Sequence, residues 1–238
     1  MKILAFDGTA RIASVAVVED TRILASYSVD NGLTQSELLL PMAEDMLKAL
    51  KLDFDDIGLY AVSVGPGSFT GVRIGVALVK GLAFGKNTPC ASVSTLEALA
   101  ENLSPMRAII VPCMDARRNQ VYNAIFEGDG KCIRRLTADR AISLTDLCEE
   151  LKDYSDKRIF VCGDGYEVAI KALTAGGIKC ETTPEMLIGE SAVSVARVAK
   201  RLYDNGETVT DTALMPTYLR LPQAERERLE RENITKQV

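Results

Sequence analysis

The chain has 238 residues and a formal net charge of −5, with 28 Lys or Arg against 33 Asp or Glu and no His. The absence of His excludes Ser-His-Asp and Cys-His nucleophile pairs, His-bearing zinc sites and imidazole proton shuttles. The net negative charge gives no general attraction for nucleic acid or an anionic membrane, so we expect the chain alone to bind RNA weakly.

The pattern of residues 1–102 predicts a meander of three strands followed by alternating helices and strands. A capping box at residues 34–37, followed by apolar residues at helical spacing, marks the first helix, which Pro41 is expected to kink. The second helix is apolar on nearly every face, which predicts burial on more than one side. The predicted strands cover residues 2–7, 13–18, 22–29 and 57–64, and the predicted helices cover 35–50, 72–84 and 94–102.

The second half of the chain repeats this layout after Ser104-Pro105, the clearest boundary in the sequence. The repeated order predicts an α/β protein of two ribonuclease-H-like units, and such lobes place ligands in the crevice beyond their strand ends. The predicted strands cover 108–115, 121–126 and 158–162, a hairpin turn lies at 128–130, and the helices cover 145–152, 166–175 and 191–203. The predicted domains are an N-terminal lobe at 1–103, a C-terminal lobe at 104–220 and a polar, charge-alternating tail at 221–238, a solvated helix or a frayed end.

Two glycine-containing loops are candidates for binding an anion. At residues 7–9 a strand-end carboxylate and exposed amides could hold magnesium or phosphate, and the alternative is a plain hairpin turn. Residues 65–71 join a buried strand to a helix N-terminus, where the dipole favours anions, but no P-loop Lys follows. The structural alternative is that Gly67 and Gly71 permit close packing while Thr70 caps the helix. The nucleotide or anion-loop candidates are Asp7, Thr9, Gly65, Gly67, Ser68, Thr70 and Gly71.

Two charged turns in the second lobe are less specific. Residues 115–118 place a carboxylate and two cations in the first hairpin, and a solvated turn is the alternative. Gly163-Asp164-Gly165 either lines a cleft between the lobes or is simply a turn.

The helices predicted at 35–50 and 72–84 carry more apolar surface than a lobe of this size needs. Gly81 and its small neighbours would let another helix approach closely. A subunit interface and a thick core both explain this pattern. The interface candidates are Leu39, Met42, Met46, Leu50, Gly75, Leu78, Val79 and Leu82.

The six cysteines are widely spaced and include no CxxC, which disfavours zinc ribbons and dithiol redox sites and predicts reduced, mostly buried thiols. The longest uncharged run, residues 57–72, is too short and too interrupted by glycine and proline to span a bilayer. Asp7 interrupts the N-terminal apolar stretch, which argues against a secretory signal. We therefore expect a cytoplasmic protein without a membrane partner.

These motifs together resemble the bacterial TsaB (YeaZ) family, whose members assist threonylcarbamoylation of the adenosine next to the anticodon of tRNA. The matching stretches are residues 3–9, 36–41, 65–75 (GPGSFTGVRIG), 114–118 and 216–220, and the glycine-rich stretch is the specific one. The resemblance implies a two-lobe actin-like, sugar-kinase-like ATPase (ASKHA) fold. It also implies a non-catalytic scaffold that docks a catalytic paralogue, TsaD, through its first two helices.

The resemblance further implies that this chain has no metal site and no cofactor of its own, with ATP and a metal ion expected in partner subunits. The metal-binding paralogue carries a His-x-x-x-His pair on its first helix, whereas residues 33–37 here are Leu-Thr-Gln-Ser-Glu. The implied partners are the TsaD-like paralogue, a TsaE-like ATPase, a second copy of the chain when it is alone, and tRNA only within the complex. Arg117 and Arg118 are the candidates for contact with tRNA.

Two other functions remain as alternatives. An ATP-dependent small-molecule kinase of the same fold would use Asp7 and Thr9 on magnesium and phosphate, and would need a phosphate-clamping Lys or an adenosine loop in the second lobe. A metallopeptidase of the glycoprotease type would need metal ligands that the sequence does not supply.

Overall fold

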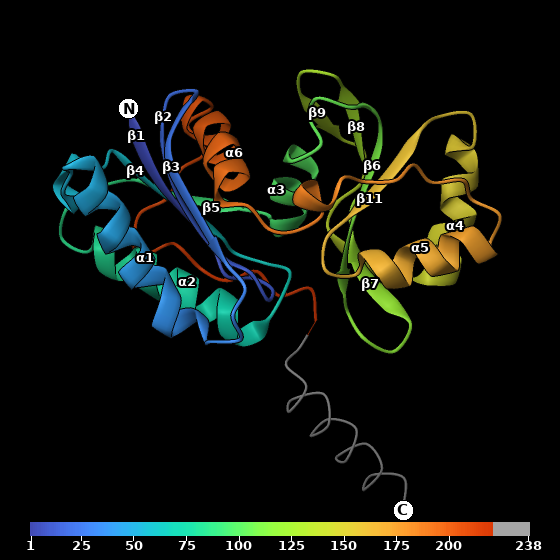
Figure 1. Cartoon of the computed structure of the whole chain (residues 1–238), viewed down its shortest axis with the longest axis horizontal. Helices are drawn as coiled ribbons and strands as arrows, with labels where there is room; N and C mark the ends of the chain where they lie inside the picture. Colours follow the sequence, from blue (N-terminus) through green and yellow to red (C-terminus); the bar gives the residue numbers. More distant parts are fainter. Residues whose placement is uncertain (221–238) are drawn as a thin grey trace, which may run out of the picture.

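The computed structural model describes residues 1–220, and the predicted tail at 221–238 lies outside the described residues. Two lobes lie side by side, each built on one sheet with helices against it (Figure 1). None of the helices within residues 1–220 is long and apolar enough to cross a membrane.

The first sheet has five strands in the order β3-β2-β1-β4-β5. The three strands of the N-terminal meander pair antiparallel, and the other two run parallel with β1 on its other side. The strands are β1 (Lys2–Asp7), β2 (Ala13–Glu19), β3 (Arg22–Val29), β4 (Leu59–Ser63) and β5 (Cys90–Val93). Their side chains are almost all buried in β1, β2 and β4, because helices cover both faces of this sheet.

In the second sheet, β6 takes the place of β1. The antiparallel strands β7 and β8 pair with it as β2 pairs with β1, and the parallel strand β11 pairs with it as β4 does. One parallel bridge, between Phe160 and Glu181, stands where the fifth strand of the first sheet would lie. The strands are β6 (Arg107–Asp115), β7 (Gln120–Asn123), β8 (Phe126–Asp129), β9 (Ile133–Arg135), β10 (Arg140–Ser143) and β11 (Ile159–Cys162).

The strand predicted at 121–126 and the turn predicted at 128–130 are wrong in detail. The strand is interrupted after Asn123 and resumes as β8, which includes Gly128 and Asp129. Pro112 in β6 lies opposite the interruption and has no N–H to donate. The Asn123 side-chain amide donates to the carbonyl oxygens of both Pro112 and Ala124 at 3.0 Å, so it supplies a donor where Pro112 has none.

The helices are exchanged between the two lobes. The helix that follows β5, α3, packs on the second sheet, and the helix that follows the second sheet, α6, packs on the first. The division at 103/104 therefore follows the two sheets, while each sheet is covered partly by a helix from the other half. The helices are α1 (Gln35–Leu50), α2 (Phe69–Ala83), α3 (Thr95–Glu101), α4 (Leu144–Leu151), α5 (Tyr166–Ala175) and α6 (Ala192–Asp204), with short 3-10 turns at Phe54–Asp56, Lys152–Tyr154 and Glu185–Leu187.

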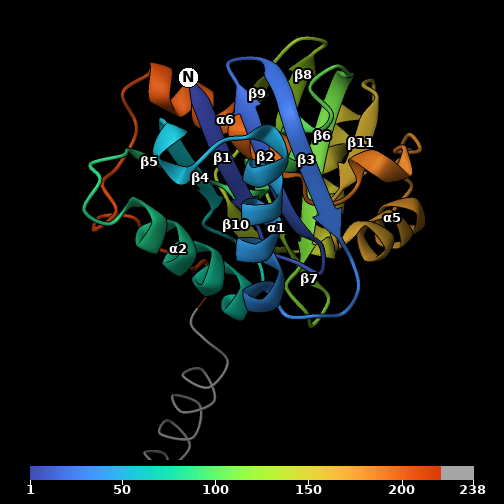
Figure 2. The same ribbon diagram turned by 60° about the vertical axis from the view of Figure 1, so that its left-hand side comes forward.

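Helices α1 and α2 lie together on the other face of the first sheet from α6, and Figure 2 shows both on the near side of that sheet. The predicted first helix at 35–50 is confirmed residue for residue, with Pro41 inside it. Glu37 accepts a hydrogen bond from the backbone N–H of Thr34 at 2.9 Å, as the capping box predicts.

After α6 the chain returns to the first lobe as a segment without helix or regular strand, residues 209–220, which we call the strap. Val209 pairs with Cys90 at the sheet edge, and the backbone N–H of Thr217 donates to the Val64 carbonyl at 2.8 Å. At its end the Arg220 guanidinium crosses to the second lobe and donates to the Ala116 carbonyl at 2.9 Å. The strap therefore joins both lobes through hydrogen bonds.

The duplicated strand order and the two lobes confirm the predicted α/β actin-like, sugar-kinase-like (ASKHA) fold of ribonuclease-H-like units. The prediction of mostly buried, unpaired cysteines is confirmed as well, since four of the six are buried and all are free. Burial raises the pKa of Cys90 to about 11 and that of Cys113 to about 12, so both are held as thiols rather than as nucleophilic thiolates.

Candidate functional site

The turn after β1 encloses a carboxylate that is already fully engaged. Asp7 is 1% exposed, and its Oδ1 accepts hydrogen bonds from the backbone N–H and the hydroxyl of Thr9, at 2.9 and 2.7 Å. Its Oδ2 accepts from the Ser63 hydroxyl at 2.5 Å. Burial raises the pKa of Asp7, and the hydrogen bonds from Ser63 and Thr9 oppose that rise. The geometry is that of the hairpin turn with a satisfied carboxylate.

The glycine-rich loop at 65–71 lies directly on this turn. A Cβ at Gly71 would stand 1.9 Å from the Gly8 carbonyl oxygen, and one at Gly67 would stand 2.4 Å from the Thr9 carbonyl oxygen. Gly67 also has a φ of 157°, and the Ser68 N–H donates to the same Thr9 oxygen at 2.7 Å. These glycines are required for backbone-to-backbone contact, as the structural interpretation predicts.

The predicted cap of α2 is wrong by two residues. Ser68, not Thr70, is the N-cap, and its hydroxyl accepts from the Gly71 N–H at 3.2 Å. The helix accordingly begins at Phe69, three residues before the predicted start. The Ser68 N–H donates to the Thr9 carbonyl oxygen, and the Gly71 N–H donates to the Ser68 hydroxyl. Two backbone donors of the loop are therefore already engaged within the protein.

The second lobe has the same kind of close backbone contact at the end of β6, the strand that corresponds to β1. Gly163 has a φ of 97°, and a Cβ there would stand 2.4 Å from the Cys113 carbonyl oxygen. The N–H of Gly165 donates to that oxygen at 3.0 Å. Gly163-Asp164-Gly165 therefore packs against the end of β6, as residues 65–71 pack against the end of β1.

A hollow of about 500 Å³ lies between the lobes, and both contribute to its walls. Asp7 does not line it, and no Lys is among its lining residues within the described chain. The pKa of Asp164 is raised, mainly by partial withdrawal from water, although the residue still reaches solvent. Its carboxylate accepts from the Asp115 backbone N–H at 2.9 Å. The lining residues are Thr9, Ala10, Arg11, Gly67, Ser68, Phe69, Met114, Asp115, Ala116, Arg117, Tyr122 and Asp164.

Aromatic rings gather at the mouth of this hollow, which the sequence interpretation did not predict. The rings of Phe69 and Tyr218 stack with centroids 4.9 Å apart and an interplanar angle of 16°. Arg73 Nε donates to the Tyr218 hydroxyl at 2.7 Å. Across the mouth the Arg220 guanidinium lies 5.6 Å from the centre of the Tyr122 ring. The sequence signal was that residues 65–75 and 216–220 belong to matching stretches, with no role attached to Phe69, Arg73, Tyr218 or Arg220.

The predicted RNA-contact residues lie on the exposed hairpin between β6 and β7. Arg117, Arg118 and Asn119 all have left-handed backbones, with φ of 59°, 53° and 59°. The carboxylate of Asp115 accepts from the Arg117 N–H at 2.7 Å, which fixes the start of this turn. Arg117 lines the hollow, whereas Arg118 is not among its lining residues.

Glu190 is a buried acid that the sequence did not single out. The residue is 6% exposed, and its Oε1 has no hydrogen-bond partner among the described residues. Burial, followed by the nearby charge of Asp7, raises the pKa of Glu190 to about 8. It precedes α6, which packs on the other lobe, so its burial depends on the exchange of helices that no local pattern reveals.

The prediction of a surface interface is wrong for several of the named residues, because they belong to the core of the first lobe. Leu39, Met46 and Val79 are fully buried and Met42 is 7% exposed. A Cβ at Gly75 would stand 3.1 Å from Val62 of the lobe's own sheet. Helical periodicity identified the apolar side of each helix, and that side faces the sheet.

The outward sides of the two helices nevertheless keep apolar or small residues. Leu50, Leu78 and Leu82 are half-buried, whereas Leu40 and Gly81 are exposed. Among residues 1–220, no atom lies within 4 Å of a Cβ built on Gly81. We call the following residues the α1–α2 outer face: Leu40, Pro41, Ala77, Leu78, Gly81 and Leu82.

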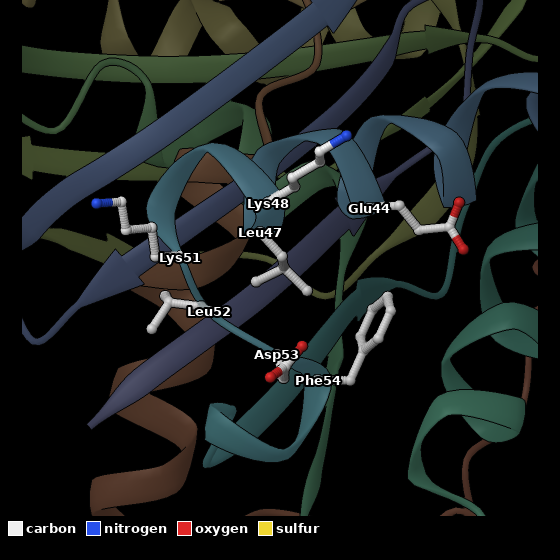
Figure 3. A pocket seen from close by; sticks show the side chains of 7 residues that line it. All are labelled: Glu44, Leu47, Lys48, Lys51, Leu52, Asp53 and Phe54. Atoms are coloured by element: carbon white, nitrogen blue, oxygen red, sulfur yellow. The ribbon is translucent and has the colours of Figure 1, made fainter.

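A second hollow, of about 510 Å³, lies at the C-terminal end of α1 (Figure 3). Its lining carries charges of both signs on Glu44, Lys48, Lys51 and Asp53, around Leu47, Leu52 and Phe54. Among residues 1–220, no three His, Cys, Asp or Glu side chains lie together so that they could hold a metal ion.

Comparisons with known proteins agree on one relationship. A model of the family described as TsaD, tRNA N6-adenosine threonylcarbamoyltransferase, matches residues 34–228. The tRNA threonylcarbamoyladenosine biosynthesis protein TsaB of Bacillus subtilis is 30% identical over 227 residues, which cover 94% of this chain and 96% of that protein. The Escherichia coli protein of the same name is 28% identical over 222 residues, covering 92% and 95%.

Solved structures give the same result for the fold. A Pseudomonas aeruginosa protein described as similar to the peptidase YEAZ superposes with a TM-score of 0.78 at 25% identity, covering 92% of this chain and 99% of that one. YeaZ from Pseudomonas aeruginosa superposes with a TM-score of 0.74 at 23% identity, with the same coverage.

Proposed function

The chain belongs to the TsaB (YeaZ) family of tRNA threonylcarbamoyladenosine biosynthesis proteins, and from this premise we propose that it is a non-catalytic subunit that docks a TsaD-like catalytic paralogue. The surface that docks the paralogue is the α1–α2 outer face. The observation that carries the proposal is this apolar face, on which Leu40, Pro41, Ala77 and Gly81 are exposed and Leu78 and Leu82 are only partly buried against the core of the first lobe.

The state of Asp7 supports a non-catalytic role. A magnesium-dependent kinase of this fold would need this carboxylate free to face the metal and phosphate, whereas Thr9 and Ser63 already occupy both of its oxygens. The glycine-rich loop covers the turn through direct backbone contact. The hollow also has no lysine in its described lining to hold a phosphate, so the kinase alternative gains no support from this site.

A shared fold explains how one face can serve two partners. The TsaD model matches residues 34–228 of this chain, so the paralogue has an equivalent pair of helices. An isologous contact between two copies of α1 and α2 can then be replaced by a pseudo-symmetric contact with the paralogue. In this proposal the chain forms a homodimer when alone, and self-association competes with docking.

The rest of the proposal assigns chemistry to the partners. ATP and a metal ion belong to partner subunits, a TsaE-like ATPase joins the complex, and tRNA is bound only within it. For this chain alone, we expect no tightly held transition metal and no threonylcarbamoyl transfer.

Docking is tested with variants that leave the first lobe's own packing intact. Gly81→Leu adds a side chain where no atom of the described residues lies within 4 Å, and Leu40→Asp puts a charge on the exposed side of α1. We expect each to weaken binding of the TsaD-like paralogue at least about 30-fold by calorimetry, as for a residue central to an interface.

The matched controls lie on α5 of the second lobe. Val168→Asp alters an apolar residue that is 47% exposed, and Ala175→Leu adds a side chain at an exposed helix position. Both controls should bind like the parent, and circular dichroism should show all four variants folded. If the folded Gly81 and Leu40 variants bind the paralogue as tightly as the parent, the docking surface lies elsewhere.

A further inference from the structure

The mouth of the hollow between the lobes is lined by aromatic rings that are held firmly from behind. We call Phe69, Arg73, Tyr122, Tyr218 and Arg220 the cleft-mouth cluster. The chain has 13 Phe and Tyr residues in total, 6 and 7 respectively, and three of them are in this cluster. Phe69 and Tyr122 both line the hollow, one from each lobe.

Each of the two lining rings is backed on one side by another group of the cluster. Tyr218 stacks on Phe69 at 4.9 Å, and its hydroxyl accepts from Arg73 at 2.7 Å. Arg220 lies over Tyr122, and its guanidinium is fixed by the Ala116 carbonyl and the Gln120 side chain. Because the rings are already ordered, a planar ligand that stacks on them pays little conformational entropy.

Four arginines of this region have no carboxylate partner among residues 1–220. Within residues 1–220, Arg73, Arg117, Arg118 and Arg220 have no carboxylate oxygen within 4.0 Å, so their charge is available to an anion. Most of the remaining described arginines are neutralised by ion pairs. These paired residues are Arg11, Arg134, Arg135, Arg140, Arg158 and Arg201.

We propose that the cleft-mouth cluster, together with Arg117 and Arg118, binds an unpaired nucleotide of an RNA strand, with the base stacked on Phe69 or Tyr122 and the strand's phosphates near the arginines. Aromatic faces accept any base, and arginines track the backbone of a single strand. The inference rests on the proposed function only in that RNA is the substrate of the complex.

Unpaired rather than duplex RNA fits this site. A duplex hides its base faces, so it cannot use the rings, and four arginines in a chain of net charge −5 give only modest attraction for phosphate. Asp115 and Asp164 line the same hollow and can accept hydrogen bonds from base amino groups, while they disfavour phosphate deep inside.

The test uses the full-length chain and a single-stranded RNA 12-mer with a central 2-aminopurine, whose fluorescence falls when the base stacks. The ring variants are Phe69→Leu and Tyr122→Leu, and Tyr203→Leu is the control because Tyr203 is 41% exposed on α6, away from the hollow. At low salt we expect quenching with the parent and the control, and binding about 5- to 100-fold weaker with at least one of the two ring variants, the range for loss of one base–aromatic stack.

The arginine variants separate charge from stacking. Arg117→Ala and Arg118→Ala should each lower the slope of log affinity against log salt by about 0.7, the value for one phosphate contact to a single strand. The ring variants should change affinity with the slope unchanged. The same RNA annealed to its complement and free AMP should bind at least about tenfold more weakly than the single strand.

Each way in which the inference could fail gives a different experimental result. The inference is overturned if both ring variants quench 2-aminopurine like the parent, or if free AMP or the duplex binds as tightly as the single strand. It is also overturned if the ring variants lose the TsaD-like paralogue and keep RNA, since the cluster would then be a protein contact. Loss of docking in Gly81→Leu with RNA binding intact leaves the inference standing, so the two proposals fail separately.

Discussion

The two lobes share a strand order but differ in what covers their outer faces. In the first lobe, α1 and α2 have 16 and 15 residues over a five-stranded sheet. In the second, α4 and α5 have 8 and 10 residues, and the fifth strand is reduced to the bridge between Phe160 and Glu181. The first lobe therefore has helical surface beyond what its sheet requires, and this excess is where we place the partner.

In contrast, one loop is built alike in both lobes: the loop between β4 and α2 in the first lobe, and the loop between β11 and α5 in the second. Gly71 and Gly67 touch the turn after β1, and Gly163 touches the end of β6. A contact repeated in both lobes is explained by packing of the ribonuclease-H-like unit. The glycine-rich loop of the first lobe thus needs no bound phosphate to account for its sequence.

The largest expected effect comes from breaking this contact in one lobe at a time. Gly71→Ala puts a Cβ 1.9 Å from the Gly8 carbonyl, so we expect the free energy of unfolding to fall by about 3 kcal/mol or more. Gly165→Ala meets the Cys113 carbonyl at 2.9 Å and should cost about 1–2 kcal/mol. Urea unfolding measures both. Equal losses would show that the two loops are packed equally tightly.

Glu190 is expected to make the stability of the protein depend on pH. The pKa of Glu190 is about 8 in the folded state, above its ordinary value of 4.5, so the folded protein holds a proton that the unfolded chain releases. Stability is therefore fully present below about pH 4.5 and falls as the pH rises towards 8. Glu190→Gln mimics the protonated form, and its stability advantage over the parent should be about 3–4 kcal/mol larger at pH 8 than at pH 5.

Glu167→Gln on α5 is the control for this titration, because Glu167 is exposed. Its unfolding profile between pH 5 and pH 8 should follow that of the parent. A Glu190→Gln variant whose advantage does not grow with pH would mean that Glu190 is ionised in the folded protein.

Local patterns predicted most of the elements, because alternation, capping residues and apolar spacing are properties of short segments. They failed where the answer depends on distant contacts. Periodicity showed that Leu39 and Met46 lie on an apolar helix side, but it cannot tell a sheet from a partner subunit as the surface that covers them. The packing of α3 on the second sheet and the burial of Glu190 both follow from the helix exchange, which no stretch of sequence encodes locally.

Helix caps allow a smaller comparison between one helix of each lobe. Ser68 caps α2 by accepting from the Gly71 N–H at 3.2 Å, and Ser143 caps α4 by accepting from the Asp146 N–H at 3.0 Å. Each change to Ala should lower the free energy of unfolding by about 1 kcal/mol. Thr70→Ala, at the residue predicted to be the cap, should change it by less than about 0.5 kcal/mol. A loss at Thr70 as large as that at Ser68 would contradict the capping geometry.

The smallest expected effects come from two glycines with open space around them, one in each lobe. In the part of the chain that the structure describes, no atom lies within 4 Å of a Cβ at Gly81 or at Gly177, so sterics alone predict that Ala is harmless at both. Gly81 lies inside α2, where Ala is a better helix former, and Gly81→Ala should stabilise the free chain by about 0.5–1 kcal/mol. Gly177 has a φ of 80°, so Gly177→Ala should destabilise it by about 1 kcal/mol. Thermal unfolding at one protein concentration measures both signs. If Gly81→Ala weakens docking of the paralogue while it stabilises the free chain, the glycine is kept for the approach of a partner helix. If the variant gains stability and docks normally, the approach of a partner helix does not require glycine at this position.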